Sequence, residues 1–141
     1  MPFLTEEEKQ EVVLAITEAE RNTSGEIKVH IESQSQKPPL ERAMEVFVEL
    51  GVYQTEARNG VLIYICLQSK QLAILGDEGI NSVVEPDFWE CTRNLILDHF
   101  KNGQYKEGLI KGVLRAGERL KNFFPYQNDD TNELSNDISF N

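Results

Sequence analysis

The chain has 141 residues, a mass of 16.1 kDa and a formal net charge of −10, from 24 acidic and 14 basic side chains. Repulsion from this charge argues against nucleic acid as a partner. Hydrophobic residues make up 40% of the chain, which excludes a disordered protein. A chain of this length forms one compact domain and buries about 68–70% of its unfolded surface.

The first ten residues, MPFLTEEEKQ, contain three consecutive glutamates where a signal peptide would carry basic residues followed by an apolar run. The longest strongly apolar run, Val61–Leu67, is far shorter than the roughly 20 residues of a membrane-spanning helix. We therefore expect a cytoplasmic protein without a membrane span, and a monomer.

Helical and strand patterns alternate along the first half of the chain. Thr5 and Glu8 fit a capping box that opens a helix to about Arg21. Residues 26–32 alternate, with isoleucines and Val29 on one face and Lys28 and His30 on the other, so we predict a strand with one wetter face near the sheet edge. An apolar stripe from residue 40 to Gly51 predicts a second helix.

The second half begins with Val61–Leu67, a run that is apolar on every side and rich in β-branched residues. This pattern predicts a central strand covered on both faces. Residues 71–75 follow as its hairpin partner, and helical patterns follow over 86–103 and 105–125.

These elements predict an α/β fold, a three-layer α/β/α sandwich in which about four helices flank a short mixed sheet. Strands 26–32 and 61–67 are parallel through a helical crossover, and the third strand returns antiparallel. We expect one domain over residues 1–125, followed by a flexible, acidic tail over residues 126–141.

Three polar loops meet at one edge of the predicted sheet. They contain residues 23–26 before the first strand, residues 55–59 before the second, and residues 76–79 after the third. The carboxylates of Asp77 and Glu78, with Glu26 nearby, are hard oxygen ligands that suit Ca²⁺ or, less well, Mg²⁺. The sequence therefore raises the hypothesis of a divalent-cation site.

A structural interpretation of the same residues stays open beside this one. Thr23 and Ser24 can form turns, and Arg58 can pair with Asp77, so that these side chains and Asn59 organise the loops or hold a small anion. No residue is assigned a catalytic role.

The same segments resemble the TPM domain family over roughly residues 3 to 125, and the chain is most similar to its short soluble bacterial branch. The resemblance rests on Ala19-Glu20, Thr23-Ser24-Gly25-Glu26-Ile27, Thr55-x-x-Arg58-Asn59-Gly60-Val61-Leu62-Ile63, Gly76-Asp77-x-Gly79-Ile80 and the tail motif Asn132-Glu133-Leu134. It implies an α/β/α sandwich, calcium binding in some members and an acid phosphatase activity reported for a plant member.

Two functions follow as expectations. The first is a divalent-cation (Ca²⁺) binding or protein-interaction module that presents its acidic surface to a protein partner. The second is a metal-assisted, phosphatase-like hydrolase, in which a metal near Asp77 polarises a phosphate oxygen and Arg58 neutralises the developing charge. Whether the protein is an enzyme stays open.

Overall fold

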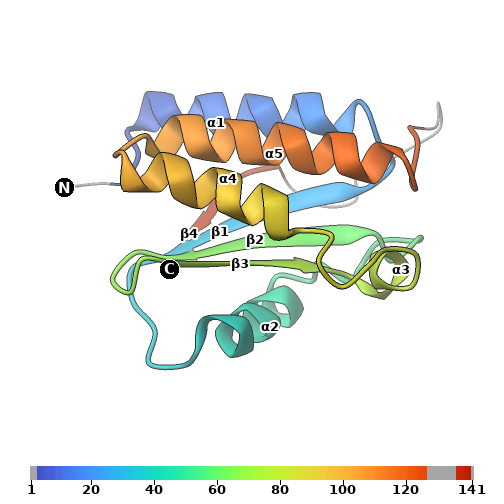
Figure 1. Ribbon diagram of the computed structural model, residues 1–141, viewed down its shortest axis with the longest axis horizontal. Coiled ribbons are helices and arrows are strands. Elements are labelled where there is room, and N and C mark those ends of the chain that lie inside the picture. Colours follow the sequence, from blue (N-terminus) through green and yellow to red (C-terminus); the bar gives the residue numbers. More distant parts are fainter. Residues whose placement is uncertain (1–2, 127–135, 141) are drawn as a thin grey trace.

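The computed structural model describes residues 3–126 and 136–140. It contains a four-stranded mixed sheet in the order β3-β2-β1-β4, with α1, α4 and α5 on one face and α2 on the other (Figure 1). This is the predicted three-layer α/β/α sandwich. The described elements are α1 (Glu6–Glu20), β1 (Glu26–Glu32), α2 (Pro39–Glu49), β2 (Gly60–Cys66), β3 (Gln71–Gly76), α3 (Glu78–Asn81), α4 (Glu90–Lys101), α5 (Tyr105–Lys121) and β4 (Ser139–Phe140).

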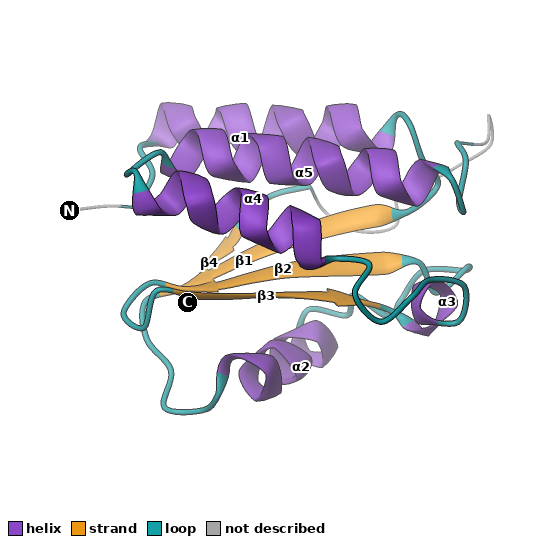
Figure 2. Ribbon diagram, in the orientation of Figure 1, coloured by secondary structure: helices purple, strands orange, loops and turns teal. Residues whose placement is uncertain are grey.

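The sheet has the predicted strand directions. β1 and β2 run parallel, and β2 and β3 form the antiparallel hairpin. Every residue of β2 is buried, because helices cover both of its faces. Figure 2 shows this arrangement, with α2 beneath the strands and α1, α4 and α5 above them.

α1 begins with the predicted capping box, in which Thr5 Oγ1 accepts a hydrogen bond from the Glu8 amide at 3.1 Å.

The three helices on the upper face pack closely through small residues. At Gly112 of α5, an added Cβ would lie 2.4 Å from the Ile96 side chain. Only glycine therefore lets α5 approach α4 this closely.

β1 differs from the prediction of a strand with a wetter face. All of its residues are buried except Lys28, which is half-buried, and His30 and Glu32 are 4% and 1% exposed. The prediction was wrong because the polar side chains of this face pair with one another and with α2, which replaces the expected water.

The last described residues of the chain form a short strand. Ser139 and Phe140 form β4, which pairs in parallel with His30 and Ile31 of β1. Lys28 Nζ also donates to the Asp137 carbonyl at 2.9 Å. The pairing with β4 supplies partners for backbone groups that this part of the outer edge of β1 would otherwise leave unpaired. The rest of the predicted tail, residues 127–135 and 141, lies outside the described residues.

The connection between β3 and α4 also differs from the prediction. Residues 78–81 form the one-turn helix α3, which was not predicted, and α4 begins at Glu90 rather than near Pro86. Asp77 starts α3 as its N-cap, since its carboxylate accepts the Glu78 amide at 2.7 Å. A single turn is too short to leave a helical period in the sequence.

Candidate functional site

The three polar loops meet at one edge of the sheet, as the strand directions require. Glu26 lies opposite Gly60 in the β1–β2 pairing, and Val61 lies opposite Gly76 in the β2–β3 pairing. Asn59 joins the first two loops, because its side-chain amide donates to Ser24 Oγ at 3.4 Å. We call this edge of the sheet, with the loops of residues 23–26, 55–59 and 76–79, the loop edge. It brings the predicted site residues into one region of the molecule.

Arg58 holds the loop edge together. Its Nε and Nη2 atoms donate to the two carboxylate oxygens of Asp77 at 2.7 and 2.9 Å, and Nη1 lies 3.1 Å from Glu78 Oε1. The hydrogen bonds to Asp77, with the negative charges of Asp77 and Glu78, raise the pKa of Arg58. The structure therefore contains the Arg58–Asp77 pair of the structural interpretation and adds Glu78 to it.

The backbone near this pair has an uncommon conformation. Arg58 has a φ of +51°, a left-handed conformation that costs a residue with a Cβ about 1–2 kcal/mol. Its carbonyl accepts the Gly79 amide at 2.9 Å. A Cβ on Gly79 would lie 2.3 Å from the Ala57 carbonyl oxygen, so the loops pass too closely for any other residue.

The two carboxylates that contact Arg58 differ in exposure. The Asp77 side chain is 5% exposed, whereas that of Glu78 is 71% exposed and that of Arg58 is 41% exposed. Asp77 is also fixed by the Glu78 amide at the start of α3. At the loop edge, the accessible guanidinium of Arg58 therefore contacts one buried carboxylate, that of Asp77, and one exposed carboxylate, that of Glu78.

Thr23 and Ser24 attach the first loop to the end of α5. Thr23 Oγ1 donates to the Phe124 carbonyl and accepts the Gly25 amide, and the Ser24 amide donates to the same Phe124 carbonyl at 2.9 Å. Thr55 Oγ1 fixes the second loop by accepting the Asn59 amide at 3.0 Å. These contacts hold the loops in place around Arg58.

Glu26 belongs to a different part of the loop edge. It lies at the start of β1 and is 4% exposed, and its charge acts on Glu20 of α1. Burial, followed by the charge of Glu26, raises the pKa of Glu20 to about 7 against the hydrogen bond from the Ile27 amide. Over residues 3–126 and 136–140, no three His, Cys, Asp or Glu side chains gather in a metal-binding cluster, so Glu26 does not join Asp77 and Glu78.

Comparison with known proteins agrees with these loop motifs. The sequence model of the TPM domain matches residues 2–119, which is most of the chain. The chain belongs to the TPM domain family. No curated protein matches it.

Two solved structures resemble this TPM domain. The NMR structure of the BA42 protein from the psychrophilic bacterium Bizionia argentinensis is 48% identical, with a TM-score of 0.94 over 99% of this chain and 97% of that one. The N-terminal domain of a P. gingivalis protein is 20% identical, with a TM-score of 0.68 over 89% of this chain and 82% of that one. The second likeness shows the fold alone.

A second polar cluster, which sequence reasoning missed, lies between the sheet and α2 of the TPM domain. Glu32, at the end of β1, accepts hydrogen bonds from Arg42 Nη2 at 2.8 Å and from the Tyr64 hydroxyl at 2.5 Å. His30 Nε2 lies 3.4 Å from Glu32, and His30 Nδ1 lies 3.0 Å from Ser139 Oγ of β4. We call these four side chains, His30, Glu32, Arg42 and Tyr64, the buried cluster.

Burial sets the charges of the buried cluster. It raises the pKa of Tyr64, with a further increase from the hydrogen bond to Glu32, and it lowers the pKa of His30 against the influence of Glu32. Hydrogen bonds to Glu32, with further ones to Glu49 and Glu45, raise the pKa of Arg42. Tyr64 therefore stays protonated and His30 neutral at neutral pH, while Arg42 supplies the positive charge beside Glu32 and shares it with Glu45 and Glu49 at the surface. A signal was present in the sequence, since Tyr64 is the one hydroxyl in an otherwise apolar strand.

Among the described residues, no helix of this TPM domain is both long enough and apolar enough to cross a membrane.

Proposed function

We propose that this TPM domain binds a divalent cation, Ca²⁺ in preference to Mg²⁺, at the carboxylates of Asp77 and Glu78. One observation carries the proposal: a single guanidinium, that of Arg58, lies between two carboxylates at distances of 2.7 to 3.1 Å. The side chains of Arg58, Asp77 and Glu78 together carry a net charge of −1, and those of Arg58 and Glu78 are both open to water. A cation that displaces Arg58 therefore finds two anionic oxygen ligands already held together.

Calcium suits this arrangement better than magnesium. Ca²⁺ accepts six to eight oxygen ligands in flexible geometry, so backbone carbonyls and water can complete a shell begun by two carboxylates. Mg²⁺ demands near-ideal octahedral geometry and releases its water reluctantly. Because the cation must compete with Arg58, the affinity is modest, and tighter loops are its main consequence.

Calcium titration of two opposing variants tests the exchange with Arg58. Asp77→Asn removes a ligand and weakens Ca²⁺ binding about tenfold, whereas Arg58→Gln removes the competitor and tightens it by a similar factor. Arg21→Gln, which breaks the exposed pair between Arg21 and Glu18, is the matched control and leaves the affinity unchanged. Calorimetry and amide chemical shifts measure all three.

The acidic tail is a competing ion sink that needs its own variant. Replacing Asp129, Asp130 and Glu133 with the corresponding amides keeps the length of the tail and leaves binding at Asp77 intact. Saturating Ca²⁺ also raises the melting temperature, because a hundredfold excess over Kd adds about 2.7 kcal/mol. A melting temperature indifferent to Ca²⁺, or equal affinities in Asp77→Asn and the unmodified protein, contradicts the proposal.

The hydrolase alternative requires Arg58 to bind a phosphoryl oxygen of the substrate. In the structure all three guanidinium nitrogens of Arg58 contact Asp77 and Glu78, so a substrate would have to displace these contacts. Hydrolysis of p-nitrophenyl phosphate that needs added metal and is lost in both Asp77→Asn and Arg58→Gln favours the hydrolase. Activity that survives both substitutions indicates a contaminant.

A second candidate function, docking of a protein partner, has support from α2. Leu40, Met44 and Val48 lie one turn apart and are 57%, 59% and 62% exposed, beside the acidic side chains of Glu41 and Glu45. This face suits a helical segment with apolar and basic residues. A Leu- and Lys-rich amphipathic peptide should shift the amide resonances of α2, and Met44→Glu should abolish the shifts. Light scattering separates this binding from self-association, which would contradict the predicted monomer.

A further inference from the structure

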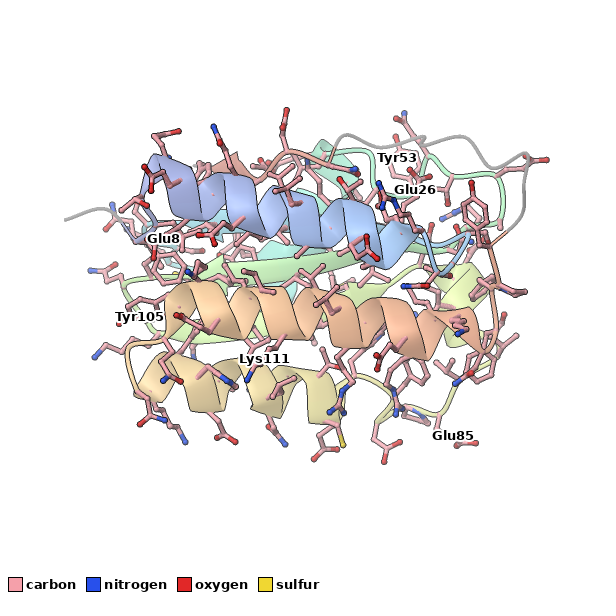
Figure 3. The ribbon with its side chains drawn as sticks, turned by 90° about the horizontal axis from the view of Figure 1, so that it is seen from above. Glu8, Glu26, Tyr53, Glu85, Tyr105 and Lys111 are labelled. Carbon is pink, nitrogen blue, oxygen red and sulfur yellow. The ribbon has the colours of Figure 1, made fainter. Side chains whose placement is uncertain are left out.

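The end of the molecule opposite the loop edge carries a groove of about 1140 Å³. It lies beyond the carboxyl end of β2, between the start of α1, the end of α4 and the start of α5. Figure 3 shows Glu8 and Tyr105, which both line it, at one end of the molecule, and Glu26 near the other. The groove is therefore separate from the proposed cation site.

The interior of the groove is apolar. Ile65 in β2 and Leu67, just after the strand, line the groove, and Ile65 is 2% exposed. Three aromatic rings form one wall: the Phe3 centroid lies 5.6 Å from that of Phe100 and 4.6 Å from that of Tyr105. Apolar and aromatic walls of this kind accommodate the hydrocarbon part of a small ligand.

The rim of the groove carries three lysines. Lys70 lies in the turn between β2 and β3, Lys101 at the end of α4 and Lys106 in α5, beside the carboxylates of Glu8 and Glu107. Lys106 lies 3.3 Å from Glu11 of α1. Within the described part of the chain, Lys70 and Lys101 have no carboxylate at ion-pair distance, so their ammonium groups are available to a ligand.

We propose that this groove binds a free amphiphilic monoanion, a medium-chain carboxylate, with its hydrocarbon chain against the aromatic wall and its carboxylate near Lys101 and Lys70. Lys106 is already paired with Glu11, so the ammonium groups of Lys70 and Lys101 supply the positive charge for a single carboxylate. Separate ammonium groups act as point charges, so they attract a single anionic headgroup without imposing the two-pronged geometry of an arginine. The apolar wall gives the chain of the ligand its contribution to affinity.

Titration with octanoate, followed by amide chemical shifts and calorimetry, tests this site. Octanoate should shift the resonances of Leu67, Leu97 and Lys101 and bind at least tenfold more tightly than acetate, which lacks the chain, and than octylammonium, which has the opposite charge. Octyl phosphate, with a second negative charge, should bind no more tightly than octanoate. Tighter octyl phosphate overturns the assignment of a monoanion.

Two lysines on the same side of the molecule give a matched pair of variants. Lys101→Glu reverses a charge on the rim and should weaken octanoate about tenfold. Lys111→Glu makes the same change at an exposed position of α5 that does not line the groove, so it should alter the affinity less than twofold. If both variants weaken octanoate binding equally, the affinity depends only on the net charge of the protein, and the proposed site is wrong.

A third variant tests the apolar wall. Tyr105 is 39% exposed, so Tyr105→Ser should leave the fold intact while it removes one ring of the wall. It should weaken octanoate several-fold and leave acetate unaffected. The proposal is wrong if octanoate at millimolar concentration shifts none of the groove resonances, or if Tyr105→Ser binds octanoate as the unmodified protein does.

Discussion

The loop edge and the buried cluster use the same chemistry in different surroundings. In each, the guanidinium of one arginine contacts a nearly buried carboxylate through more than one nitrogen, Arg58 with Asp77 and Arg42 with Glu32. The arginines differ in exposure, however, at 41% for Arg58 and 16% for Arg42. An arginine with an exposed side chain can be exchanged for another cation at small cost, whereas one that is mostly buried beside a buried carboxylate is a fixed part of the fold.

The neighbours of each pair reinforce this difference. Glu32 accepts hydrogen bonds from Arg42 and the Tyr64 hydroxyl, so its charge is compensated from two elements at once. Glu78 is mostly exposed, so water can replace Arg58 as its partner. We therefore expect ligand exchange at the loop edge and structural stability from the buried cluster.

The largest expected effect is the loss of Arg42. Arg42→Met keeps the hydrocarbon part of the side chain but removes the guanidinium from the buried Glu32 carboxylate, and with it the contacts to Glu45 and Glu49. The free energy of unfolding should fall by about 3–5 kcal/mol, the usual cost of removing one partner of a buried ion pair. Urea unfolding measures the change.

Arg21→Met is the control for this prediction, because Arg21 is 71% exposed and pairs, among the described residues, with the surface carboxylate of Glu18. It should cost less than about 1 kcal/mol. If Arg42→Met costs no more than Arg21→Met, water reaches Glu32 and the proposed contrast between the two regions is wrong.

Glu20 sharpens the comparison, because it is a largely buried carboxylate that no described cation contacts. Its pKa of about 7 in the folded state lies above the unfolded value of 4.5, so folding favours the protonated form. The contribution of Glu20 to stability is therefore fully present below pH 4.5 and is lost as the pH rises to about 7. Glu20→Gln, which cannot ionise, should be more stable than the unmodified protein by about 1–3 kcal/mol above pH 7 and equally stable near pH 4.

Unfolding by urea across this pH range tests the role of Glu20. Glu18→Gln on the same helix is the matched control, because it removes the same charge from a side chain that is 58% exposed. A pH-independent effect of Glu20→Gln would show that the carboxylate ionises in the folded state as it does in the unfolded chain.

The two regions also differ in how far the sequence could predict them. The loops of Arg58 and Asp77 are predictable, because apolar periodicity places the strands and the strand directions then bring their ends together. Periodicity could not predict the buried cluster, since His30 and Glu32 have the alternating pattern of a solvated face. Their burial depends on Arg42, which only the packed position of α2 brings near, and on a two-residue strand, β4, that is too short to leave a pattern.

Loss of the exposed Arg58 should lower the free energy of unfolding less than loss of the mostly buried Arg42. Arg58→Gln removes the two hydrogen bonds to Asp77, and we expect a loss of about 1–2 kcal/mol in the free energy of unfolding. The loss should shrink in about 1 M NaCl, where charges are screened beyond about 3 Å, while the effect of Arg42→Met should change less, because its main partner Glu32 is buried. Equal salt dependence of the two variants would contradict the difference in exposure on which the comparison depends.

The smallest expected effect separates the charge of Arg58 from its backbone. Because Arg58 has a φ of +51°, every variant that keeps an ordinary side chain there also keeps the cost of the left-handed conformation. Asparagine adopts this conformation more readily than glutamine, since its short amide can hydrogen-bond locally. Arg58→Asn and Arg58→Gln both lose the contacts to Asp77, so their difference reports the backbone alone, and Arg58→Asn should be the more stable by about 0.5–1 kcal/mol. Equal stabilities in urea unfolding would mean that the loop relaxes once the guanidinium is gone, in which case the contacts to Asp77 and Glu78 themselves hold residue 58 in its left-handed conformation.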